Sequence, residues 1–381
     1  MARPGVAVIG TGFIGPVHVE ALRRIDMPVV GILGSSAQRS REGAEALGVA
    51  RAYASLDELL ADDAARVVHI TSPNKAHFEQ AKRCLEAGRH VVCEKPLAMT
   101  SKETSELVTL ASTTGLVAAV NYNLRFYPLA IEARERIKRG DLGRVMHVTG
   151  GYVQDWLLHD TDFNWRVLAE QAGETRAIGD IGTHWMDLIT FICGSDIESV
   201  CADLATFLPV RQRPLGSVQT FTSGASHAVE TAPVEIKTED YASILLRFQG
   251  GGHGCVTVSQ VTAGRKNCLR YEIAGADGSM FWNSERPNEL WLGHRDQPNQ
   301  ILLRDPSLLT EAARAYAAYP GGHNEGFPDT FKQLYRAIYA DIQAGTPSPT
   351  PNYPTFEDGH REVCLCEAIL QSHREQRWVP V

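Results

Sequence analysis

Short apolar runs alternate with segments of helical periodicity through residues 1–123. The strands that the apolar runs predict span residues 6–9, 29–33, 66–70, 90–93 and 116–121. The helices predicted between them span residues 13–25, 38–47, 75–87 and 101–114. Strands that alternate with helices are joined by right-handed crossovers, and continuous apolar strands are typical of a sheet covered on both faces. The pattern therefore predicts a parallel, doubly wound α/β sheet.

The hydrophobic pattern changes after residue 123. Longer alternating runs predict strands at residues 145–153, 200–207, 241–248, 255–262, 268–274 and 279–282. Helices are predicted at 127–139, 180–193, 327–344 and 356–376, and a loop rich in Trp, Asp and His at 154–178. We therefore expect a domain at 1–123 and a second, α+β domain at 124–381. The second domain should hold an open, mostly antiparallel sheet covered by helices on one face. A partner subunit usually hides an uncovered apolar face, so we expect a homodimer or homotetramer.

Composition excludes several classes of protein. The 381 residues are 44% hydrophobic and 22% charged, which excludes a disordered chain, a collagen and a coiled-coil rod. The net charge of −8 and the absence of a Lys/Arg-rich run give no reason to expect a nucleic-acid or membrane partner. No apolar run approaches the ~18 residues of a membrane span, and the N-terminus does not have the pattern of a secretory signal.

Cysteine and histidine spacing indicates neither disulfides nor a metal site. The eight cysteines contain no C-x-x-C pair, and the 13 histidines form no H-E-x-x-H pattern. We therefore expect reduced thiols, no metal and a cytoplasmic location.

A glycine motif indicates a nucleotide site at the end of the first predicted strand. Residues 10–15 read Gly10-Thr11-Gly12-Phe13-Ile14-Gly15, a G-x-G-x-x-G spacing between a strand and a helix. That is the context of a dinucleotide-binding Rossmann domain. Gly10 would form the tight turn, Gly12 would admit the pyrophosphate, and Gly15 would let the helix pack closely on the strand. The helix N-terminus would bind the phosphates.

The residue that reads the ribose should follow the second strand. NAD sites usually place an acidic residue there, whereas this chain has Ser35 and Ser36, followed by Arg39. No carboxylate is available to repel a 2′-phosphate, and Arg39 can pair with one. We therefore expect NADP as the preferred cofactor; the alternative is NAD held by the serine hydroxyls, with Arg39 simply solvated.

Two further motifs hold titratable side chains. Lys95 lies in Glu94-Lys95-Pro96, after a strand whose carboxyl end should border the ligand crevice. Asp180 and His184 are four residues apart and would share one face of a helix. A histidine transfers protons near neutral pH, and a neighbouring carboxylate can orient it.

In this order and at these separations, the three motifs resemble those of the Gfo/Idh/MocA oxidoreductase family. Other segments are similar as well: residues 71–77 resemble the loop that borders the adenosine half, and residues 121–128 resemble the segment that joins the domains. Trp165-Arg166 resembles the pair that precedes the catalytic helix, and residues 322–323 and 354–359 resemble the starts of the last two helices.

The resemblance implies an NAD(P)-dependent dehydrogenase in which Lys95, Asp180 and His184 are catalytic. His184 would take the hydroxyl proton, Lys95 would hydrogen-bond the same oxygen, and Asp180 would orient the substrate or His184. Hydride would pass from the carbinol carbon to the nicotinamide. The cofactor-binding residues expected from the motifs and the resemblance are Gly10, Gly12, Phe13, Ile14, Gly15, Ser35, Ser36, Arg39, Thr71, Pro73, Asn74, His77, Glu94, Lys95, Asn123, Trp165 and Arg166.

This chain departs from the family pattern in one segment. Two adjacent glycines often precede the family's catalytic aspartate, whereas residues 172–179 here include Glu174 and Arg176. These two side chains are expected to alter the cofactor or substrate edge of the site.

The family acts largely on sugars, inositols and related polyols, so a carbohydrate or polyol substrate is expected. Asp155 and Trp156 suit a sugar, because carboxylates bind hydroxyls and aromatic rings cover C–H faces. The alternative is that this loop only packs the core. The substrate-binding residues expected are Lys95, Tyr122, Asp155, Trp156, Asp180, His184 and His323.

Two other functions stay open on the sequence alone. One is a glycoside hydrolase that oxidises its substrate transiently with a tightly held NAD. The other is a dinucleotide-binding sensor without activity, against which the intact catalytic trio argues.

Overall fold

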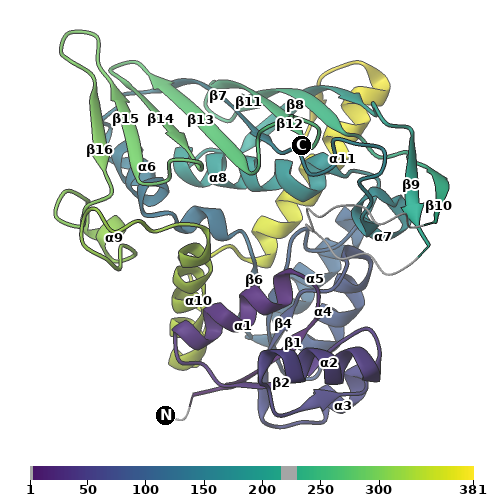
Figure 1. Cartoon of the computed structure of the whole chain (residues 1–381). Helices are drawn as coiled ribbons and strands as arrows, with labels where there is room; N and C mark the ends of the chain where they lie inside the picture. The colour runs from purple at the N-terminus through teal and green to yellow at the C-terminus, as the bar shows by residue number, and fades with distance from the viewer. Residues whose placement is uncertain (1–2, 216–229) are drawn as a thin grey trace.

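The computed structural model describes residues 3–215 and 230–381, which form two large sheets and their helices (Figure 1). The N-terminal sheet has six parallel strands in the order β3-β2-β1-β4-β5-β6. They are β1 (Gly5–Ile9), β2 (Val29–Leu33), β3 (Ala52–Tyr53), β4 (Ala65–Ile70), β5 (His90–Cys93) and β6 (Ala118–Val120). The helices between them are α1 (Ile14–Arg24), α2 (Ala37–Leu47), α3 (Leu56–Leu60), α4 (His77–Glu86) and α5 (Ser101–Thr114). The predicted doubly wound parallel sheet is confirmed.

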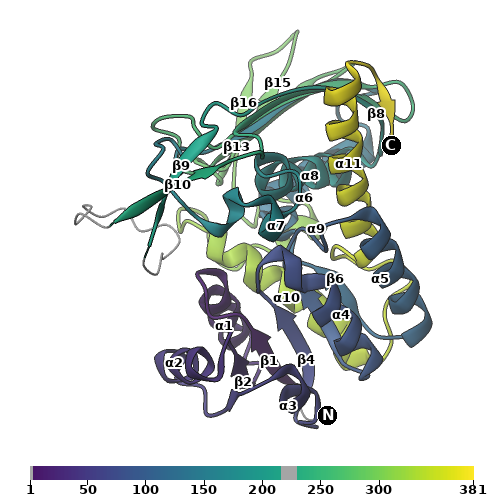
Figure 2. The ribbon, with the colours of Figure 1, turned by 90° about the vertical axis from the view of Figure 1, so that its right-hand side faces the viewer.

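Alternate residues of the central strand face two different cores. Val6 and Val8 belong to the core that includes Val19 and Leu22 of α1, whereas Ala7 and Ile9 belong to the core beneath α4 and α5. The first core is completed by α10 (Phe327–Ala344), a C-terminal helix that packs against α1 (Figure 2). Both faces of the sheet are therefore covered, as continuous apolar strands require.

Local capping defines where the helices begin and end. At α5, Thr100 Oγ1 accepts a hydrogen bond from the Glu103 amide (3.2 Å), and the Glu103 carboxylate accepts one from the Thr100 amide (3.1 Å). This capping box satisfies amides that have no partner inside the helix. The helix ends at Gly115, whose φ of +66° is a left-handed conformation that favours glycine. Such signals lie within the sequence, which explains why the limits of α5 match the predicted ones.

The second large sheet has nine strands in the order β16-β15-β14-β13-β7-β12-β11-β8-β17. Only β7 and β12 pair in parallel; the other neighbours are antiparallel. The strands are β7 (Val145–Val153), β8 (Ile197–Ala205), β11 (Tyr241–Phe248), β12 (His253–Ser259), β13 (Cys268–Gly275), β14 (Ser279–Asn283), β15 (Glu289–Gly293), β16 (Gln300–Leu303) and β17 (Val379–Pro380). A separate two-stranded sheet pairs β9 (Val210–Pro214) with β10 (Thr231–Glu235) in antiparallel orientation. The predicted mostly antiparallel sheet is confirmed.

Helices cover one face of this sheet. In Figure 1, α6 (Pro128–Arg139) and α8 (Thr183–Cys193) lie beneath the strands, while no helix of the described residues covers the upper face. Helix α11 (Phe356–Glu375) packs against both β8 and α5, and so connects the two sheets. Two shorter helices, α7 (Ala169–Ala172) and α9 (Glu311–Arg314), lie in the connecting loops.

Several short elements were not predicted. Strands β3 and β17 have two residues each, too few for a pattern. Strands β9 and β10 contain charged residues and proline, so they have no apolar pattern. In β9 the side chain that is buried is Arg211, which donates hydrogen bonds to carbonyls of the loop at 157–162. The helix predicted to begin at Asp180 begins earlier, with a π-helical turn at Ile178–Gly182 that continues into α8.

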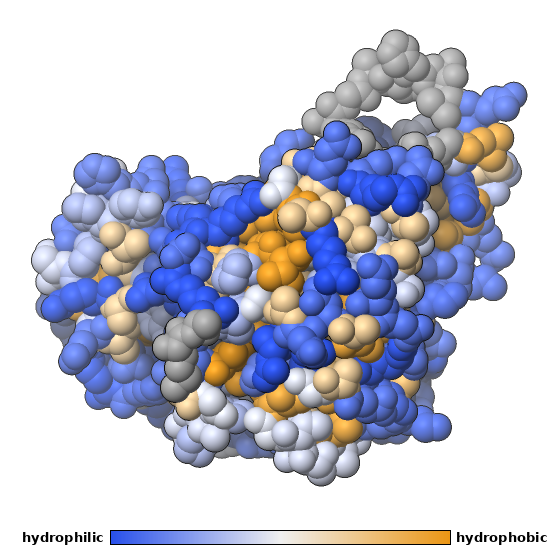
Figure 3. Space-filling view, turned by 90° about the horizontal axis from the view of Figure 1, so that it is seen from below, coloured by the Kyte–Doolittle hydropathy of each residue, from blue (hydrophilic) through white to orange (hydrophobic). Residues whose placement is uncertain are grey.

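No helix in the described ranges, 3–215 and 230–381, is long and apolar enough to cross a membrane. Seen from below, apolar residues gather near the middle of a mostly hydrophilic surface (Figure 3).

Candidate active site

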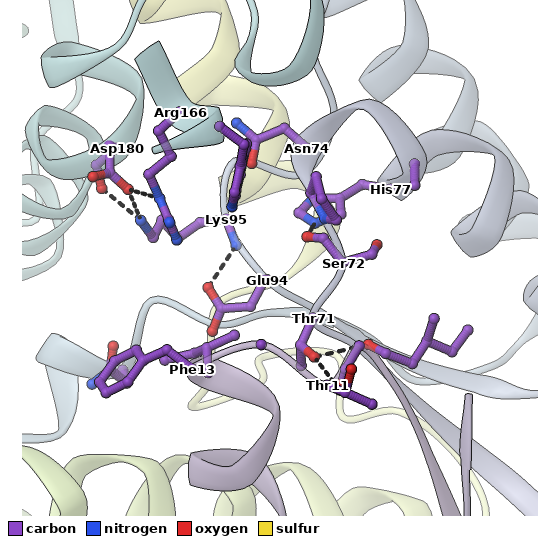
Figure 4. A pocket seen from close by; sticks show the side chains of 18 of the residues that line it. Thr11, Phe13, Thr71, Ser72, Asn74, His77, Glu94, Lys95, Arg166 and Asp180 are labelled. Carbon is purple, nitrogen blue, oxygen red and sulfur yellow. Dashed lines mark hydrogen bonds and ion pairs between the residues drawn. The ribbon is translucent and has the colours of Figure 1, made fainter. Parts of the chain in front are cut away.

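A cavity of about 830 Å³ lies between the two sheets, at the carboxyl ends of β1, β4 and β5 (Figure 4). One part is lined by the glycine motif, and another by Lys95, Asp180 and His184. The predicted nucleotide and catalytic motifs thus meet in one cavity. In open α/β sheets this is where ligands bind.

The glycines of the motif meet different constraints. Gly10 has a φ of +113°, and a Cβ there would lie 2.4 Å from Thr71 Oγ1. A Cβ on Gly15 would lie 2.3 Å from the Gly10 carbonyl oxygen, so only glycine lets α1 approach the turn. A Cβ on Gly12 meets nothing within 4 Å, which leaves open space where a ligand can approach the backbone. Together with the uncapped first turn of α1, this is a cradle for phosphate groups.

The ribose end of the cavity is lined by Ser35 but not by Ser36 or Arg39. Ser36 instead caps α2, since its Oγ accepts a hydrogen bond from the Arg39 amide (3.2 Å). The Arg39 guanidinium is exposed and donates to Glu42 one turn further along the helix (3.3 Å). No carboxylate lines this end of the cavity among the residues that the structure describes.

The loop after β4 closes one wall. Thr71, Pro73, Asn74 and His77 all line the cavity, as expected. The Asn74 amide donates to the Ala172 carbonyl (2.9 Å). The two His77 ring nitrogens each lie 2.8 Å from a backbone carbonyl, that of Ser72 within the loop and that of Pro96 in the Glu-Lys-Pro turn. The contacts of Asn74 and His77 therefore tie the loop to the segment before Asp180 and to the Glu-Lys-Pro turn.

Lys95 and Asp180 form a partly buried ion pair at the cavity (Figure 4). Lys95 Nζ donates to Asp180 Oδ1 (3.0 Å) and to the Asp180 backbone carbonyl (2.6 Å). Arg166 Nε lies 3.2 Å from the same carboxylate oxygen, and Gln260 Nε2 donates to the other (2.8 Å). Burial acts to raise the pKa of Asp180, but the charges of Lys95 and Arg166 outweigh burial and hold the pKa well below its usual range. Asp180 is therefore an ionised anchor for Lys95.

His184 lines the same cavity and has no hydrogen bond to Asp180 among the contacts of these two described residues. Its ring packs edge-on against Tyr122, with 5.6 Å between centroids. Its Nδ1 is buried without a hydrogen-bond partner. Burial, together with the charge of Lys95, lowers the pKa of His184 to about 3, although Glu94 and Asp180 oppose the shift. The imidazole is therefore neutral in the ligand-free protein.

Glu94 is held by a chain of buried hydrogen bonds. Its Oε1 lies 3.0 Å from His18 Nε2 and 2.5 Å from Asn121 Nδ2. His18 Nδ1 lies 3.0 Å from His69 Nδ1, and His69 Nε2 lies 3.1 Å from the Tyr339 hydroxyl. Burial favours the neutral form of Glu94, but the hydrogen bond with His18 and the charge of Lys95 lower the pKa of Glu94 to about 2. With one proton on each imidazole, all three bonds form only in one direction: the Tyr339 hydroxyl donates to His69, His69 donates to His18, and His18 donates to Glu94.

The π-helical turn that carries Asp180 is held by a second buried network. The Glu239 carboxylate accepts hydrogen bonds from the backbone amides of Arg176 (2.9 and 3.0 Å) and Ile178 (2.8 Å). The Arg176 guanidinium pairs with Asp240, and so does Arg211 (2.9 Å). All four charged side chains are buried. Amides at a helix start need such acceptors, so this network determines where the turn begins.

This network corrects the expectation for the segment before Asp180. Arg176 was expected at the cofactor or substrate edge but is fully buried, because Asp240 and Glu239 hold it away from the cavity. Glu174 is exposed and pairs with Arg374 (3.2 Å). Neither side chain lines the cavity.

Four residues expected at the substrate do not line the cavity. Tyr122 is fully buried behind His184. Asp155 is engaged by Lys266 Nζ (2.7 Å), and Trp156 donates to Gln154 Oε1 (2.8 Å). His323 is exposed in the loop before α10. Asn123, Trp165 and Arg166 do line it.

The sequence reasoning missed the side chains that border the cavity at the end of β7. These are Tyr152 and Gln154, with Lys266 and Asn267 from the loop before β13. A signal was available for Tyr152 and Gln154, because residues two apart in an extended segment share a face. Asp155, which was predicted instead, lies on the opposite face. Nothing in the local sequence marks Asn267, which reaches the site through the pairing of β13 with β7.

The described residues contain no group of three or more potential metal ligands.

Comparison with known proteins follows the same division of the chain. Residues 5–122 match the model of the oxidoreductase family with the NAD-binding Rossmann fold, and residues 130–281 match the GFO/IDH/MocA C-terminal domain. The chain is 29% identical to levoglucosan dehydrogenase of Pseudarthrobacter phenanthrenivorans, covering 100% of this chain and 99% of that protein. It is 32% identical to 1,5-anhydro-D-fructose reductase of Ensifer adhaerens, over 81% of this chain and 85% of the relative. A structure of levoglucosan dehydrogenase in complex with NADH and L-sorbose superimposes with a TM-score of 0.89 at 27% identity, covering 100% and 99% of the two chains.

The ionisation of His184 can be tested directly. Its pKa of about 3 predicts a neutral ring in the ligand-free protein from about pH 8 down to about pH 5. Histidine ring signals should be followed by NMR across this range, with the His184→Gln protein used to assign the signal. We expect no titration of this ring. A midpoint near the ordinary value of about 6.5 would contradict the description.

Proposed function

The chain belongs to the Gfo/Idh/MocA oxidoreductase family, and on that premise we propose the reaction that it catalyses. It transfers a hydride between the nicotinamide of NAD(P) and a secondary hydroxyl or ketone carbon of a sugar, sugar derivative or cyclitol. The observation that carries this proposal is the meeting of Lys95, Asp180 and His184 with the glycine motif in one cavity. The sugar and sugar-derivative names of the two relatives support the substrate class.

The cavity suits a dinucleotide. Gly12 leaves open space beside the uncapped first turn of α1, where backbone amides would hold the pyrophosphate. Thr71, Pro73 and Asn74 would border the adenosine half, and Glu94 and Asn123 would border the nicotinamide half. When bound, the cofactor supplies the hydride acceptor or donor at its nicotinamide ring.

The protein's own groups would manage the proton of the substrate hydroxyl. The neutral His184 would take this proton during oxidation and return it during reduction. Lys95 uses two of its three N–H donors on Asp180, which leaves the third for the reacting oxygen. That donor favours the negative charge that develops on the oxygen. Asp180 acts on Lys95 rather than on His184, since its carboxylate contacts Lys95, Arg166 and Gln260.

Replacing Lys95 should remove turnover and spare cofactor binding. We expect Lys95→Met to lower kcat by about 10²–10³-fold, the usual cost of losing a donor at a developing charge, and His184→Gln by about 10²–10⁴-fold. Net NAD(P)H formation should be followed by absorbance with a panel of sugars and cyclitols, and cofactor binding by titration. Lys102→Met, on the exposed side of α5, is the matched control. Full activity of Lys95→Met would refute this assignment.

We propose NADP(H) as the preferred cofactor. Ser35 lines the ribose end, no described carboxylate opposes a phosphate there, and Arg39 follows one helical turn later. Its exposed pair with Glu42 is of the weak kind that a phosphate can replace.

This preference should reverse when a carboxylate is introduced. We expect Ser35→Asp to weaken NADPH binding about tenfold or more, because like charges would face each other, and to change NADH binding much less. Arg39→Gln should weaken the binding of NADPH more than that of NADH. Fluorescence titration of the wild type and the two variants with both reduced cofactors measures the six dissociation constants. Wild-type protein that binds NADH as tightly as NADPH would overturn the preference.

The chain's organisation supports three smaller proposals. We place the domain boundary at residues 123 and 124, with α10 returning to pack on the first domain. We propose a cytoplasmic location because all eight cysteines are free thiols. We also propose that a second copy of this chain covers the helix-free face of the large sheet.

That face, here called the open face, carries a continuous row of side chains across eight strands. Strand register places the row in the order Cys201, Leu245, Cys255, Thr149, Glu272, Phe281, Trp291 and Ile301. Leu245 is 49% exposed and Ile301 is 59% exposed, although both are large and apolar. Exposed apolar residues that share a surface mark an interface.

Charge placed on the open face should separate the subunits. We expect wild-type protein to sediment as a dimer or tetramer and Leu245→Arg to shift it toward the monomer. Leu308→Arg is the control, because Leu308 is also exposed (57%) but lies in the loop before α9. A monomeric wild type, or an unchanged assembly in Leu245→Arg, would contradict the proposal.

A further inference from the structure

Three polar side chains form a hydrogen-bonded group at the wall of the cavity near Asp180. Tyr152 lies at the end of β7, Gln154 follows that strand, and Asn267 precedes β13. Asn267 Oδ1 accepts hydrogen bonds from the Tyr152 hydroxyl (2.7 Å) and from Gln154 Nε2 (2.7 Å). Gln154 Oε1 in turn accepts a hydrogen bond from Trp156 Nε1 (2.8 Å). Tyr152, Gln154 and Asn267 all line the cavity.

The indole of Trp156 determines the direction of every bond in this group. An indole nitrogen can only donate, so Gln154 must present its oxygen to Trp156 and its NH₂ to Asn267. Asn267 must then present its oxygen to Gln154, and the hydroxyl of Tyr152 must donate to that same oxygen. A flipped Asn267 amide would set two NH₂ groups against each other.

This order leaves the Asn267 NH₂ group as an oriented donor. Among the described residues, Asn267 Nδ2 has no hydrogen-bond acceptor, and the side chain is exposed at the cavity rim. Its oxygen already accepts two hydrogen bonds, so the side chain has only donors left to offer a ligand.

The two carboxylates near this donor already accept hydrogen bonds. Both oxygens of Asp180 accept hydrogen bonds, and Asp155 Oδ2 is engaged by Lys266 and by the Gly264 amide. The Tyr152 oxygen keeps a lone pair, but this side chain is only 4% exposed. A substrate hydroxyl placed against Asn267 must find an acceptor for its own proton. An ether, acetal or ketone oxygen carries no proton and needs none.

We infer that Asn267 is a specificity-determining residue that donates to a proton-free oxygen of the substrate, the ring or bridging acetal oxygen of a sugar. The inference rests on the proposed function and narrows it. The site selects sugars that contain a ring oxygen over carbocyclic cyclitols, which carry only hydroxyls. Tyr152, Gln154 and Trp156 are positioning residues, because they act through the Asn267 amide.

The substitution Asn267→Asp tests this inference with almost no change in shape. An aspartate oxygen still accepts from Tyr152 and Gln154, but the second oxygen replaces the donor NH₂ with an acceptor. Two oxygens would then face each other, and a lost hydrogen bond of this kind changes affinity by about tenfold to a hundredfold. Asn352→Asp makes the same chemical change in the exposed loop before α11 and serves as the control.

The experiment measures kcat and KM for two groups of compounds with the full-length enzyme. Levoglucosan, D-glucose and D-xylose contain a ring oxygen, and myo-inositol and scyllo-inositol do not. For the wild type we expect higher kcat/KM with the first group. In Asn267→Asp the KM for the first group should rise about tenfold or more, with kcat and cofactor binding little changed, while the inositols should be affected less.

The outcomes separate the two claims. A wild type that prefers the inositols, or an Asn267→Asp protein with unchanged KM for the ring-oxygen sugars, overturns the role of Asn267 and leaves the proposed function in place. A wild type that binds cofactor but forms no NAD(P)H with any member of either group overturns the proposed function, and the inference with it.

Discussion

The ion pair between Lys95 and Asp180 is the contact on which the arrangement of the site depends. It joins the Glu-Lys-Pro turn of the first sheet to the π-helical turn that begins α8 beneath the second sheet. Lys95 also donates to the Asp180 backbone carbonyl, so its position follows the turn itself and not only the carboxylate. Even a partly buried pair costs desolvation free energy, and the hydrogen bonds that Arg166 and Gln260 donate to Asp180 help to offset this cost. The pair therefore holds an ammonium group between the nucleotide motif and His184.

A separate network of buried hydrogen bonds holds the backbone segment that carries each residue of this pair. On the side of Lys95, Glu94 is fixed by His18 and by the proton order that continues into the first core. On the side of Asp180, Glu239 accepts the amides at the start of the turn. Neither network contacts the cavity beyond Glu94, yet each determines the position of a backbone segment that does. Pre-organisation of this sort places charged groups before the substrate arrives, which is what electrostatic catalysis requires.

The sequence predicted most where the signal is local. Apolar runs predicted the strands of the first sheet, and the helix predicted at 101–114 has the limits of α5, where the cap at Thr100 is a local signal. It predicted least where contacts between residues far apart in the sequence determine the structure. The buried Arg211 made β9 look like a polar loop, and Arg176 seemed to belong to the ligand edge because no local pattern announces Asp240. At the substrate wall, the alternation of β7 offered a signal for Tyr152 that was missed, and Asn267 reaches the wall only through the pairing of β13 with β7. Ion pairs and side-chain amides depend on partners far along the chain, and a single sequence does not reveal these partners.

Isotopic labelling distinguishes direct hydride transfer, from a sugar carbon to the nicotinamide, from other reactions of the same site. The enzyme should be incubated with oxidised cofactor and a sugar that carries deuterium on its ring carbons, and the reduced cofactor examined by NMR and mass spectrometry. We expect one deuterium on the nicotinamide C4 carbon of each reduced molecule. Reduced cofactor without deuterium would contradict this expectation. So would cleavage of a glycoside with no net reduction of the cofactor, which is the result expected of a hydrolase that only oxidises its substrate transiently.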